Sequence, residues 1–288
     1  MKSTVYFTKD ISSQGLMKIY KALGVSLKEK VGVKLSTGEP GGHNFLQPSL
    51  IKELVQSVEG TIIECNTAYK GKRRKTEDHL QTVKDHGFTA IAPCDIMDAD
   101  SEMSIPVTNG HHLSENFVGS NLKNYSSLLV LSHFKGHVMG GYGGALKNIS
   151  IGIASAAGKA HIHGVGEPEK IWTADRQSFL ECMADASASV IDYIGAENMA
   201  YINIANNISI DCDCDPNPKA PEMADIGIFA SLDPVAVDQA AIDAIYNSPD
   251  EGKASLIERI ESINGVHTIE AANALKLGNR EYEIVNID

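Results

Sequence analysis

Residues 132–148, with the sequence SHFKGHVMGGYGGALKN, connect a predicted β-strand to a predicted α-helix. The strand spans 125–132, and its Leu-Leu-Val-Leu centre is typical of a strand that is buried on both faces. The helix spans about 144–156 and is rich in small residues. A strand, a glycine-rich turn and a helix in this order begin a βαβ unit, which predicts a parallel sheet.

The rest of the chain repeats this alternation of short apolar runs and segments with helical spacing. Strands are predicted at 31–35, 61–65, 89–92, 200–211 and 225–230, and helices at 48–58, 76–84 and 175–193. Thr76 is a candidate helix N-cap, and Asp233-Pro234 is typical of the start of another helix. The predicted fold class is therefore α/β, with mostly parallel sheet structure and helices on both faces.

The chain shows no internal repeat and no low-complexity linker. We expect residues 1–288 to form a single structural unit, in which two α/β lobes of about 1–120 and 121–288 could surround a central crevice. Residues 95–120 are polar and contain Gly and His, so they are predicted as a long surface loop with a short strand at 104–108.

Composition limits the classes of partner. The chain has 288 residues and a formal net charge of −12, so its surface repels phosphate backbones and anionic lipids. We expect no nucleic-acid or membrane partner, and we interpret the basic run 71–75 as a solvated loop. The five cysteines do not resemble a secreted disulfide framework. Without a signal peptide or an apolar run of ~18 residues, the protein is expected to be soluble and cytoplasmic.

The turn at 132–148 is the richest candidate site, because the carboxyl ends of parallel strands face the ligand crevice. Glycines there let backbone N–H groups approach an anion closely. A histidine can move a proton near neutral pH, and a lysine can bind an anion or form a covalent adduct. The predicted catalytic residues are His137, Lys147 and His133, and the predicted ligand-binding residues are Lys135, Gly140, Gly141, Gly143, Gly144 and Asn148.

A second candidate is the run Asp-Cys-Asp-Cys-Asp at 211–215. Cys212 and Cys214 offer two soft metal ligands, although the partner Cys-x-x-Cys pairs of a zinc or iron–sulfur signature are absent. The neighbouring carboxylates would raise the thiol pKa values. A metal or redox site and a simple turn with buried cysteines both remain open.

Two further polar positions lie near these runs. If residues 161–163 are extended, at most one of His161 and His163 faces the same pocket as His137. Asp238 could reach the pocket, whereas Asp233 is more simply a helix cap.

The combination His133-x-Lys-Gly-His137-x-x-Gly-Gly-x-Gly-Gly-Ala-Leu-Lys-Asn, with Asp-Cys-Asp-Cys at 211–214 and the run 230–238, resembles the domain-of-unknown-function family numbered 362. The resemblance covers about 34–245. Many members of that iron–sulfur-related family carry a ferredoxin-like insert after the position of His163. This chain has only Cys182 between His163 and Tyr201, so we expect no intrinsic four-cysteine iron–sulfur cluster.

A shorter stretch of about 30 residues is similar to the core motif of the lactate racemase family. It contains His137, Lys147 and His163 in the family's order. The resemblance implies an acid/base role for His137, a lysine at 147 that tethers a nickel-pincer nucleotide, and a nickel ligand at His163. Together with Cys212 and Cys214, His163 completes the predicted set of metal ligands.

These observations favour a metal- or cofactor-dependent enzyme that performs redox or proton-transfer chemistry on a small anionic molecule. It would be an oxidoreductase or a racemase- or isomerase-like enzyme, with a transition metal as cofactor. A non-catalytic metal or cofactor carrier is the alternative, and a scaffold without chemistry is the third reading. A redox partner protein and a homodimer are compatible with either active role.

Overall fold

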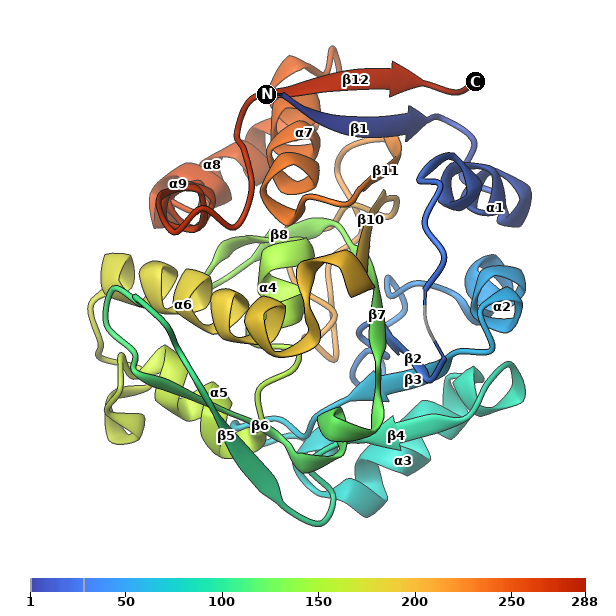
Figure 1. Ribbon diagram of the computed structural model, residues 1–288. Coiled ribbons are helices and arrows are strands. Elements are labelled where there is room, and N and C mark those ends of the chain that lie inside the picture. The colour runs from blue at the N-terminus through green and yellow to red at the C-terminus, as the bar shows by residue number, and fades with distance from the viewer. Residues whose placement is uncertain (1, 28) are drawn as a thin grey trace.

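A large β-sheet is the central feature of the computed structural model, which describes residues 2–27 and 29–288 (Figure 1). Within these residues the sheet has eight strands in the order β12-β1-β11-β10-β7-β2-β3-β4. Neighbouring strands are parallel except where β11 pairs with β1 and β10. The strands are β1 (Ser3–Thr8), β2 (Val31–Lys34), β3 (Thr61–Glu64), β4 (Cys94–Ile96), β7 (Ser127–His133), β10 (Met199–Ala205), β11 (Gly227–Ser231) and β12 (Tyr282–Asn286). The predicted α/β class with a mostly parallel sheet is confirmed.

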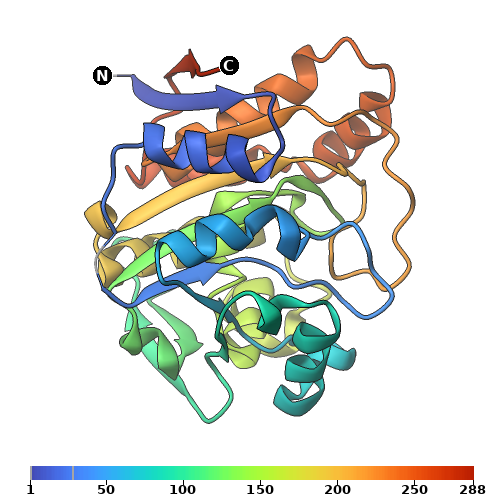
Figure 2. The same cartoon turned by 90° about the vertical axis from the view of Figure 1, so that its right-hand side faces the viewer.

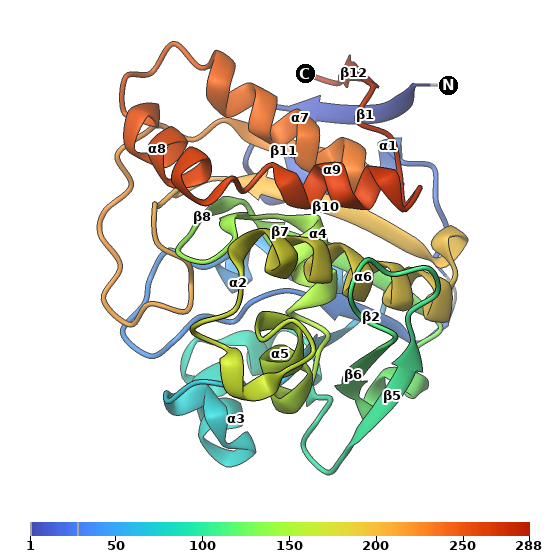
Figure 3. The same cartoon turned by 90° about the vertical axis from the view of Figure 1, so that its left-hand side faces the viewer.

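Helices cover both faces of the sheet, as predicted. One face carries α1 (Ser13–Ala22), α2 (Pro48–Ser57) and α3 (Thr76–Asp85), of which α1 and α2 lie in front of the strands in Figure 2. The other carries α4 (Ala145–Ser150), α6 (Arg176–Ile194), α7 (Pro234–Asn247), α8 (Lys253–Ile263) and α9 (His267–Ala274), which are seen from their own side in Figure 3.

Strand β7 shows why the Leu-Leu-Val-Leu run at its centre is apolar. All seven of its residues are buried. Leu129 and Leu131 pack into the core on the α1–α2 side, whereas Leu128 and Val130 pack into the core on the α4–α7 side. Successive side chains of a strand point to opposite faces, so a strand between two helical layers needs apolar residues at every position.

The prediction of a long surface loop at 95–120 is wrong, because much of this segment is β-structure, although the short strand predicted at 104–108 overlaps one of its strands. Strands β5 (Glu102–Pro106) and β6 (Glu115–Gly119) form an antiparallel hairpin that packs against α6. Ile105 and Val118 are buried, while alternate residues such as Ser104 face solvent. The polar residues on the exposed face make the composition resemble that of a loop.

Several smaller predictions also need correction. The strand predicted at 200–211 ends at Ala205 in β10, and the helix predicted at about 144–156 ends at Ser150 in α4. The strand expected at 89–92 overlaps a 3-10 turn, η2 (Phe88–Ala90), and β4 begins only at Cys94. Helix α3 begins at Thr76 itself, so Thr76 is not its N-cap, and its hydroxyl accepts a hydrogen bond from the Asn66 amide (2.9 Å). Residues 161–163 are not extended, because they end helix α5 (Ala156–His163).

The start of α7 matches its prediction. Pro234 occupies the first turn, and the Asp233 side chain accepts hydrogen bonds from the backbone N–H groups of Val235 and Ala236 (both 2.9 Å). This carboxylate satisfies two of the N–H groups that a helix start leaves without an intrahelical partner.

Parallel pairing of β10, β7, β2 and β3 brings their carboxyl ends to one edge of the sheet. After β7 comes a small hairpin of β8 (Lys135–His137) and β9 (Gly141–Gly143), and after β10 comes the loop 206–226. The two segments touch, because the Gly136 N–H donates to the Ser209 carbonyl (2.8 Å). None of the helices in the described residues has the length and apolar character needed to cross a bilayer.

Candidate functional site

A cavity of about 300 Å³ lies at the carboxyl edge of the sheet. It is lined by residues that follow β2, β3, β7 and β10, by α4 and α5, and by the segment around Trp172. Of the residues predicted as functional, those that line it are His133, Lys135, His137, Gly143, Gly144, Lys147, Asn148, His163, Cys212 and Cys214. Gly140 and Gly141 are not among the lining residues; Gly140 ends the turn between β8 and β9, and Gly141 begins β9.

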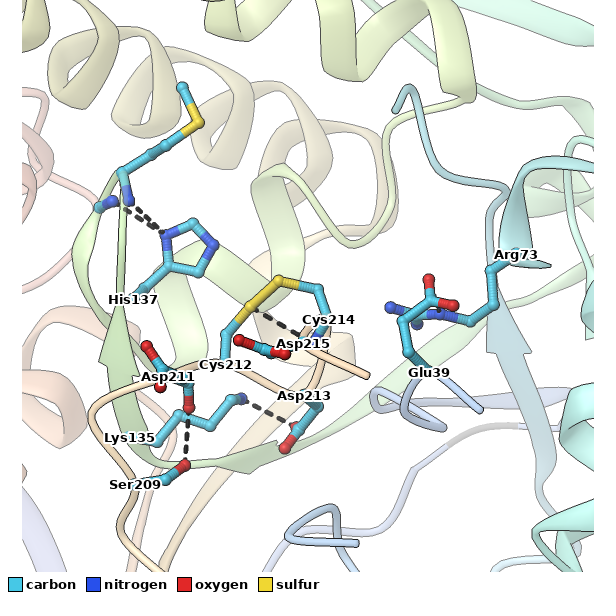
Figure 4. The surroundings of a disulfide bond; sticks show 12 residues. Glu39, Arg73, Lys135, His137, Ser209, Asp211, Cys212, Asp213, Cys214 and Asp215 are labelled. Atoms are coloured by element: carbon cyan, nitrogen blue, oxygen red, sulfur yellow. Dashed lines mark hydrogen bonds and ion pairs between the residues drawn. A yellow bond between two sulfur atoms is a disulfide. The ribbon is translucent and has the colours of Figure 1, made fainter. Parts of the chain in front are cut away.

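His137 lies at the end of β8 and is 6% exposed. Its Nδ1 atom accepts hydrogen bonds from the backbone N–H groups of Met139 (3.2 Å) and Gly140 (2.9 Å), as Figure 4 shows. A nitrogen that accepts two N–H bonds carries no proton, so the neutral ring carries its proton on Nε2. Burial lowers the pKa of His137 well below its usual value, and the charge of Lys147 lowers it further. His137 is therefore neutral and offers an Nε2–H donor.

His163 lies in the last turn of α5 and has the opposite arrangement. Its Nδ1 atom lies 2.7 Å from the Lys159 carbonyl, which can only accept, so Nδ1 carries the proton. The Nε2 atom then keeps its lone pair. Burial lowers the pKa of His163 to about 4, and the ring stacks on Phe179 with 4.6 Å between the ring centroids. His163 therefore presents a neutral nitrogen that can accept a proton or ligate a metal.

Lys147 projects from α4 and is the lysine best placed to bind a ligand. Its Nζ atom has no hydrogen-bond or ion-pair partner among residues 2–27 and 29–288. Burial lowers the pKa of Lys147 to about 7, and the charges of Lys135, Lys34 and Lys159 contribute in the same direction. An amine with this pKa is present in both charged and neutral forms near neutral pH.

Asp238 does not line the cavity, contrary to the possibility that it reaches the pocket; it supports the helix that carries Lys147. The buried carboxylate accepts hydrogen bonds from the Ala145 N–H (2.7 Å), the Leu146 N–H (3.0 Å) and the Asn203 amide (2.7 Å). A side chain at Gly144 would collide with this carboxylate, which explains the glycine. Burial raises the pKa of Asp238 to about 6.

Asn148 and His133 line the cavity, but the Asn148 side-chain nitrogen and both His133 ring nitrogens already have hydrogen-bond partners. The Asn148 amide donates to the carbonyls of Lys34 and Leu131, both at 3.1 Å, and so joins the ends of β2 and β7. His133 pairs through Nδ1 with Asp213 (2.8 Å) and through Nε2 with the Asn206 carbonyl (2.7 Å). Both ring nitrogens are occupied, so His133 orients the loop after β10 instead of meeting a ligand directly.

Cys212 and Cys214 are joined by a disulfide in the loop after β10. Asp213, between them, points toward Lys135 in Figure 4 and forms an ion pair with its Nζ atom (3.0 Å). The two sulfurs and a ring nitrogen of His137 all lie within 4.8 Å of one another, the arrangement of a three-ligand metal group. The histidine beside the sulfurs is thus His137; His163 lines the cavity but lies outside this group.

Several cavity residues could not be recognised as functional from the sequence. Lys34 and Lys159 are buried and donate to the carbonyls of Leu35 (2.7 Å) and Ala154 (2.6 Å). Burial lowers the pKa of Lys34 to about 8 and also lowers that of Lys159. Lys34 belongs to no motif with a characteristic spacing, so the sequence does not mark it as functional. The one clue is its position at the end of β2, directly after the apolar residues Val31–Val33.

Arg73 contradicts the interpretation of 71–75 as a solvated loop. Its guanidinium is 6% exposed and pairs with Glu39 (3.0 Å) and Glu64 (3.4 Å). Burial alone would raise the pKa of Glu64, but the His79 hydrogen bond and the Arg73 charge outweigh burial and hold the pKa well below its usual range. The other residues of the run are exposed, so the prediction is correct for them.

Fold and cavity together define an α/β protein with a cationic pocket at the carboxyl edge of its sheet. The family model of the domain of unknown function DUF362 matches residues 31–243, and the chain belongs to this family. No curated protein matches the chain in sequence.

Two solved structures resemble the fold. The lactate racemase apoprotein from Thermoanaerobacterium thermosaccharolyticum is 13% identical, with a TM-score of 0.48 over 85% of this chain and 57% of that protein. A protein from Thermotoga maritima is 15% identical, with a TM-score of 0.45 over 91% of this chain and 58% of that protein. The chain therefore spans less than two thirds of either protein.

Proposed function

We propose that this protein is an enzyme that binds a small carboxylate in the cavity and moves a proton next to the carboxylate group. The observation that carries the proposal is the pair of opposite histidine tautomers in one cavity, His137 with an Nε2–H and His163 with a free Nε2 lone pair. A donor and an acceptor of this kind are what general acid–base chemistry requires.

The charges of the cavity favour an anion. Its lining includes five cationic side chains, Lys34, Arg73, Lys135, Lys147 and Lys159, against the carboxylates of Glu64 and Asp213. Both carboxylates are already paired, Glu64 with Arg73 and Asp213 with Lys135. Because Lys147 has no partner of its own among the described residues, it is the group best placed to bind the substrate's charge.

Each side chain then has one role. Lys147 binds the carboxylate, the Nε2 atom of His163 takes the proton from the adjacent carbon, and the Nε2–H of His137 donates to the oxygen on which negative charge develops. His133 and Asn148 hold the strand ends in place.

A metal or another cofactor fits two places in the cavity. The free Nε2 atom of His163 is a suitable nitrogen ligand, and Cys212 with Cys214 supplies two thiolates when the disulfide is reduced. When bound, a metal ion would polarise a substrate oxygen or stabilise an adjacent carbanion.

Trp172 makes the first test simple, because it is the only tryptophan of the chain, lines the cavity and is 69% exposed. Small 2-hydroxy, 2-oxo and 2-amino carboxylates are titrated while tryptophan fluorescence is recorded. We expect at least one to bind, and Lys147→Met to weaken its binding by about tenfold or more, as for loss of one charged contact. Lys52→Gln, on the exposed face of α2, is the control and should bind normally.

The second test detects the chemistry itself. A bound carboxylate is incubated with the protein in D₂O, and NMR follows the exchange of its α-hydrogen for deuterium. Exchange should require His163 and disappear in His163→Gln although the ligand still binds. The proposal fails if no carboxylate of the panel binds, or if exchange proceeds equally in His163→Gln.

A metal carrier is the second candidate, favoured by the group of His137, Cys212 and Cys214. The test is metal analysis of protein purified anaerobically, without a histidine tag, beside Cys212→Ser/Cys214→Ser and Lys147→Met variants. Metal that is lost only from the cysteine variant supports the carrier. Metal that is lost from the Lys147 variant supports a cofactor held in the enzyme's cavity. No metal in any sample contradicts the carrier and leaves metal-free proton transfer.

A further inference from the structure

The Cys212–Cys214 disulfide closes a ring of only three residues, since the two cysteines are two positions apart. A disulfide stabilises a fold mainly by shortening the loops of the unfolded chain, and a loop this short leaves little to gain. Asp213, in the middle of the ring, is held by His133 and Lys135, so the turn has anchors that do not depend on the sulfurs. The disulfide is therefore expected to contribute little to the stability of the fold.

The two sulfurs differ in their surroundings. Cys212 is 8% exposed, and its Sγ atom accepts a hydrogen bond from the Cys214 N–H (3.3 Å). Cys214 is more exposed, and both residues line the cavity. An incoming nucleophile thus meets Cys214 first, and the N–H group already directed at Cys212 stabilises negative charge on the sulfur that leaves.

We propose that Cys212 and Cys214 form a reversible redox centre whose partner is a small thiol that carries a carboxylate. This reaction is additional to the proposed proton transfer and does not depend on it. The thiolate attacks Cys214 Sγ, the S–S bond breaks, and its electron pair leaves on Cys212 Sγ. A second thiolate attacks the substrate sulfur of the mixed disulfide and releases Cys214 as a thiolate. Two thiols are oxidised to one disulfide, and their two protons end on the cysteines.

The cavity explains why the partner should be anionic. Lys147 has no hydrogen-bond or ion-pair partner among the described residues, and the cavity lining carries more cationic side chains than carboxylates. A ring nitrogen of His137 lies within 4.8 Å of both sulfurs, and the Nε2–H of this ring is a further donor in the cavity. A carboxylate on the thiol would be attracted to this end of the cavity, whereas an ammonium group would be repelled.

Cys65 also lines the cavity but does not provide an alternative centre. Its thiol donates to the Ile153 carbonyl (3.3 Å), and burial raises its pKa to about 12. Thiolates are the nucleophiles of disulfide exchange, so Cys65 is unreactive near neutral pH.

The first experiment compares three reductants of similar size: mercaptoacetate, 2-mercaptoethanol and cysteamine, which are anionic, neutral and cationic. Loss of the Cys212–Cys214 bond is followed by differential alkylation and peptide mass analysis. An oxidised Asp-Cys-Asp-Cys-Asp peptide provides the intrinsic reactivity of each thiol. Relative to the peptide, we expect the protein to favour mercaptoacetate over cysteamine by about tenfold or more, as for electrostatic attraction into a charged cleft.

Lys147→Met should reduce this preference several-fold, whereas Lys52→Gln, which removes a charge outside the cavity, should not. A preference no greater than that of the peptide overturns the choice of an anionic thiol. A bond that resists all three thiols under native conditions overturns the redox centre itself.

The second experiment tests the order of attack. Each single variant is treated with the disulfide of mercaptoacetate. Cys212→Ser keeps the more exposed Cys214 and should accumulate a mixed disulfide of one mercaptoacetate per chain. Cys214→Ser keeps the buried Cys212 and should react at least about tenfold more slowly, since access limits exchange. Faster labelling of Cys214→Ser than of Cys212→Ser contradicts the assignment, and α-hydrogen exchange in both variants reports separately on the proton-transfer site.

Metal analysis distinguishes this centre from a carrier. If the purified protein holds one metal ion on both thiols and does not form the disulfide with a mild oxidant, the pair is a metal site and the redox proposal is wrong. A disulfide that forms and reopens in metal-free protein supports it.

Discussion

His137 and His163 line the same cavity but present opposite hydrogen-bond roles to it, because the Nδ1 atom of His137 is an acceptor and the Nδ1 atom of His163 is a donor. The Nδ1 atom of His137 accepts from the N–H groups of the β8–β9 turn, and that of His163 donates to the carbonyl of Lys159. The remaining nitrogen is therefore a donor in the first ring and an acceptor in the second. Neither property can be recognised from two histidines in a sequence.

This relationship can be measured directly. At pH 7 we expect long-range ¹H–¹⁵N NMR spectra to show His137 as the Nε2–H tautomer and His163 as the Nδ1–H tautomer. Burial lowers the pKa of His163 to about 4, so its ring should stay neutral down to about pH 5. The same tautomer in both rings would contradict the assigned roles.

Binding of a small carboxylate should depend on pH through Lys147. Its pKa is lowered to about 7, so the amine is charged below pH 7 and increasingly neutral above it. Affinity should fall as pH rises from 7 to 9, by up to about tenfold per pH unit if the charge is essential. Fluorescence titrations at each pH measure this.

Lys147→Arg is the matched control for that titration. A guanidinium stays charged throughout this pH range, so its affinity should be nearly constant from pH 6 to 9. If wild type and Lys147→Arg show the same decline, another group is responsible.

Arg73 should be essential for stability although it lies in a basic run. Arg73→Met leaves the buried carboxylates of Glu39 and Glu64 without their shared cation, at a cost of about 3–5 kcal/mol in the free energy of unfolding. Arg74→Met, at the exposed neighbouring position, should change it by less than about 0.5 kcal/mol. Urea denaturation of both variants provides the comparison.

The same pair of variants should differ in their response to acid. Because the folded-state pKa of Glu64 is depressed, its contribution to stability is complete above the unfolded pKa of about 4.3 and is lost as pH falls below it. Wild type and Arg74→Met should lose stability between about pH 5 and 3, and Arg73→Met should lose less. Equal acid sensitivity would mean that Arg73 does not hold Glu64 ionised.

Asp238 should affect both the stability of the fold and the affinity for a carboxylate, although it does not line the cavity. Asp238→Ala leaves the N–H groups of Ala145 and Leu146 buried and unpaired, which should cost about 2–4 kcal/mol. Helix α4 would lose its anchor, so carboxylate affinity should fall as well. Asp192→Ala, on the exposed face of α6, should leave stability and affinity near wild type. Normal affinity in Asp238→Ala would show that α4 is positioned by packing alone.

Much of the fold could be predicted because its signals are local. The apolar run of β7 and the Asp233-Pro234 start of α7 are each encoded within a few neighbouring residues. The hairpin of β5 and β6 could not be recognised, because only one of its faces is buried. Which face that is depends on how the two strands pair. The terminal strands β1 and β12 likewise could not be recognised, and they pair with each other across almost the whole length of the chain.

The sequence by itself determined many of the central strands and helices and that polar residues gather after β7, because strand periodicity, glycine turns and helix caps act over short distances. Only the tertiary structure decided the chemistry of the cavity. The packing of separate segments brought Lys34, Arg73 and Lys159 into one cavity and placed His137 beside the cysteines. Burial then lowered the pKa of Lys147, and the folded backbone around each ring set the proton positions of the two histidines. Charge, desolvation and tautomer depend on neighbours in space, and those neighbours exist only once the chain has folded.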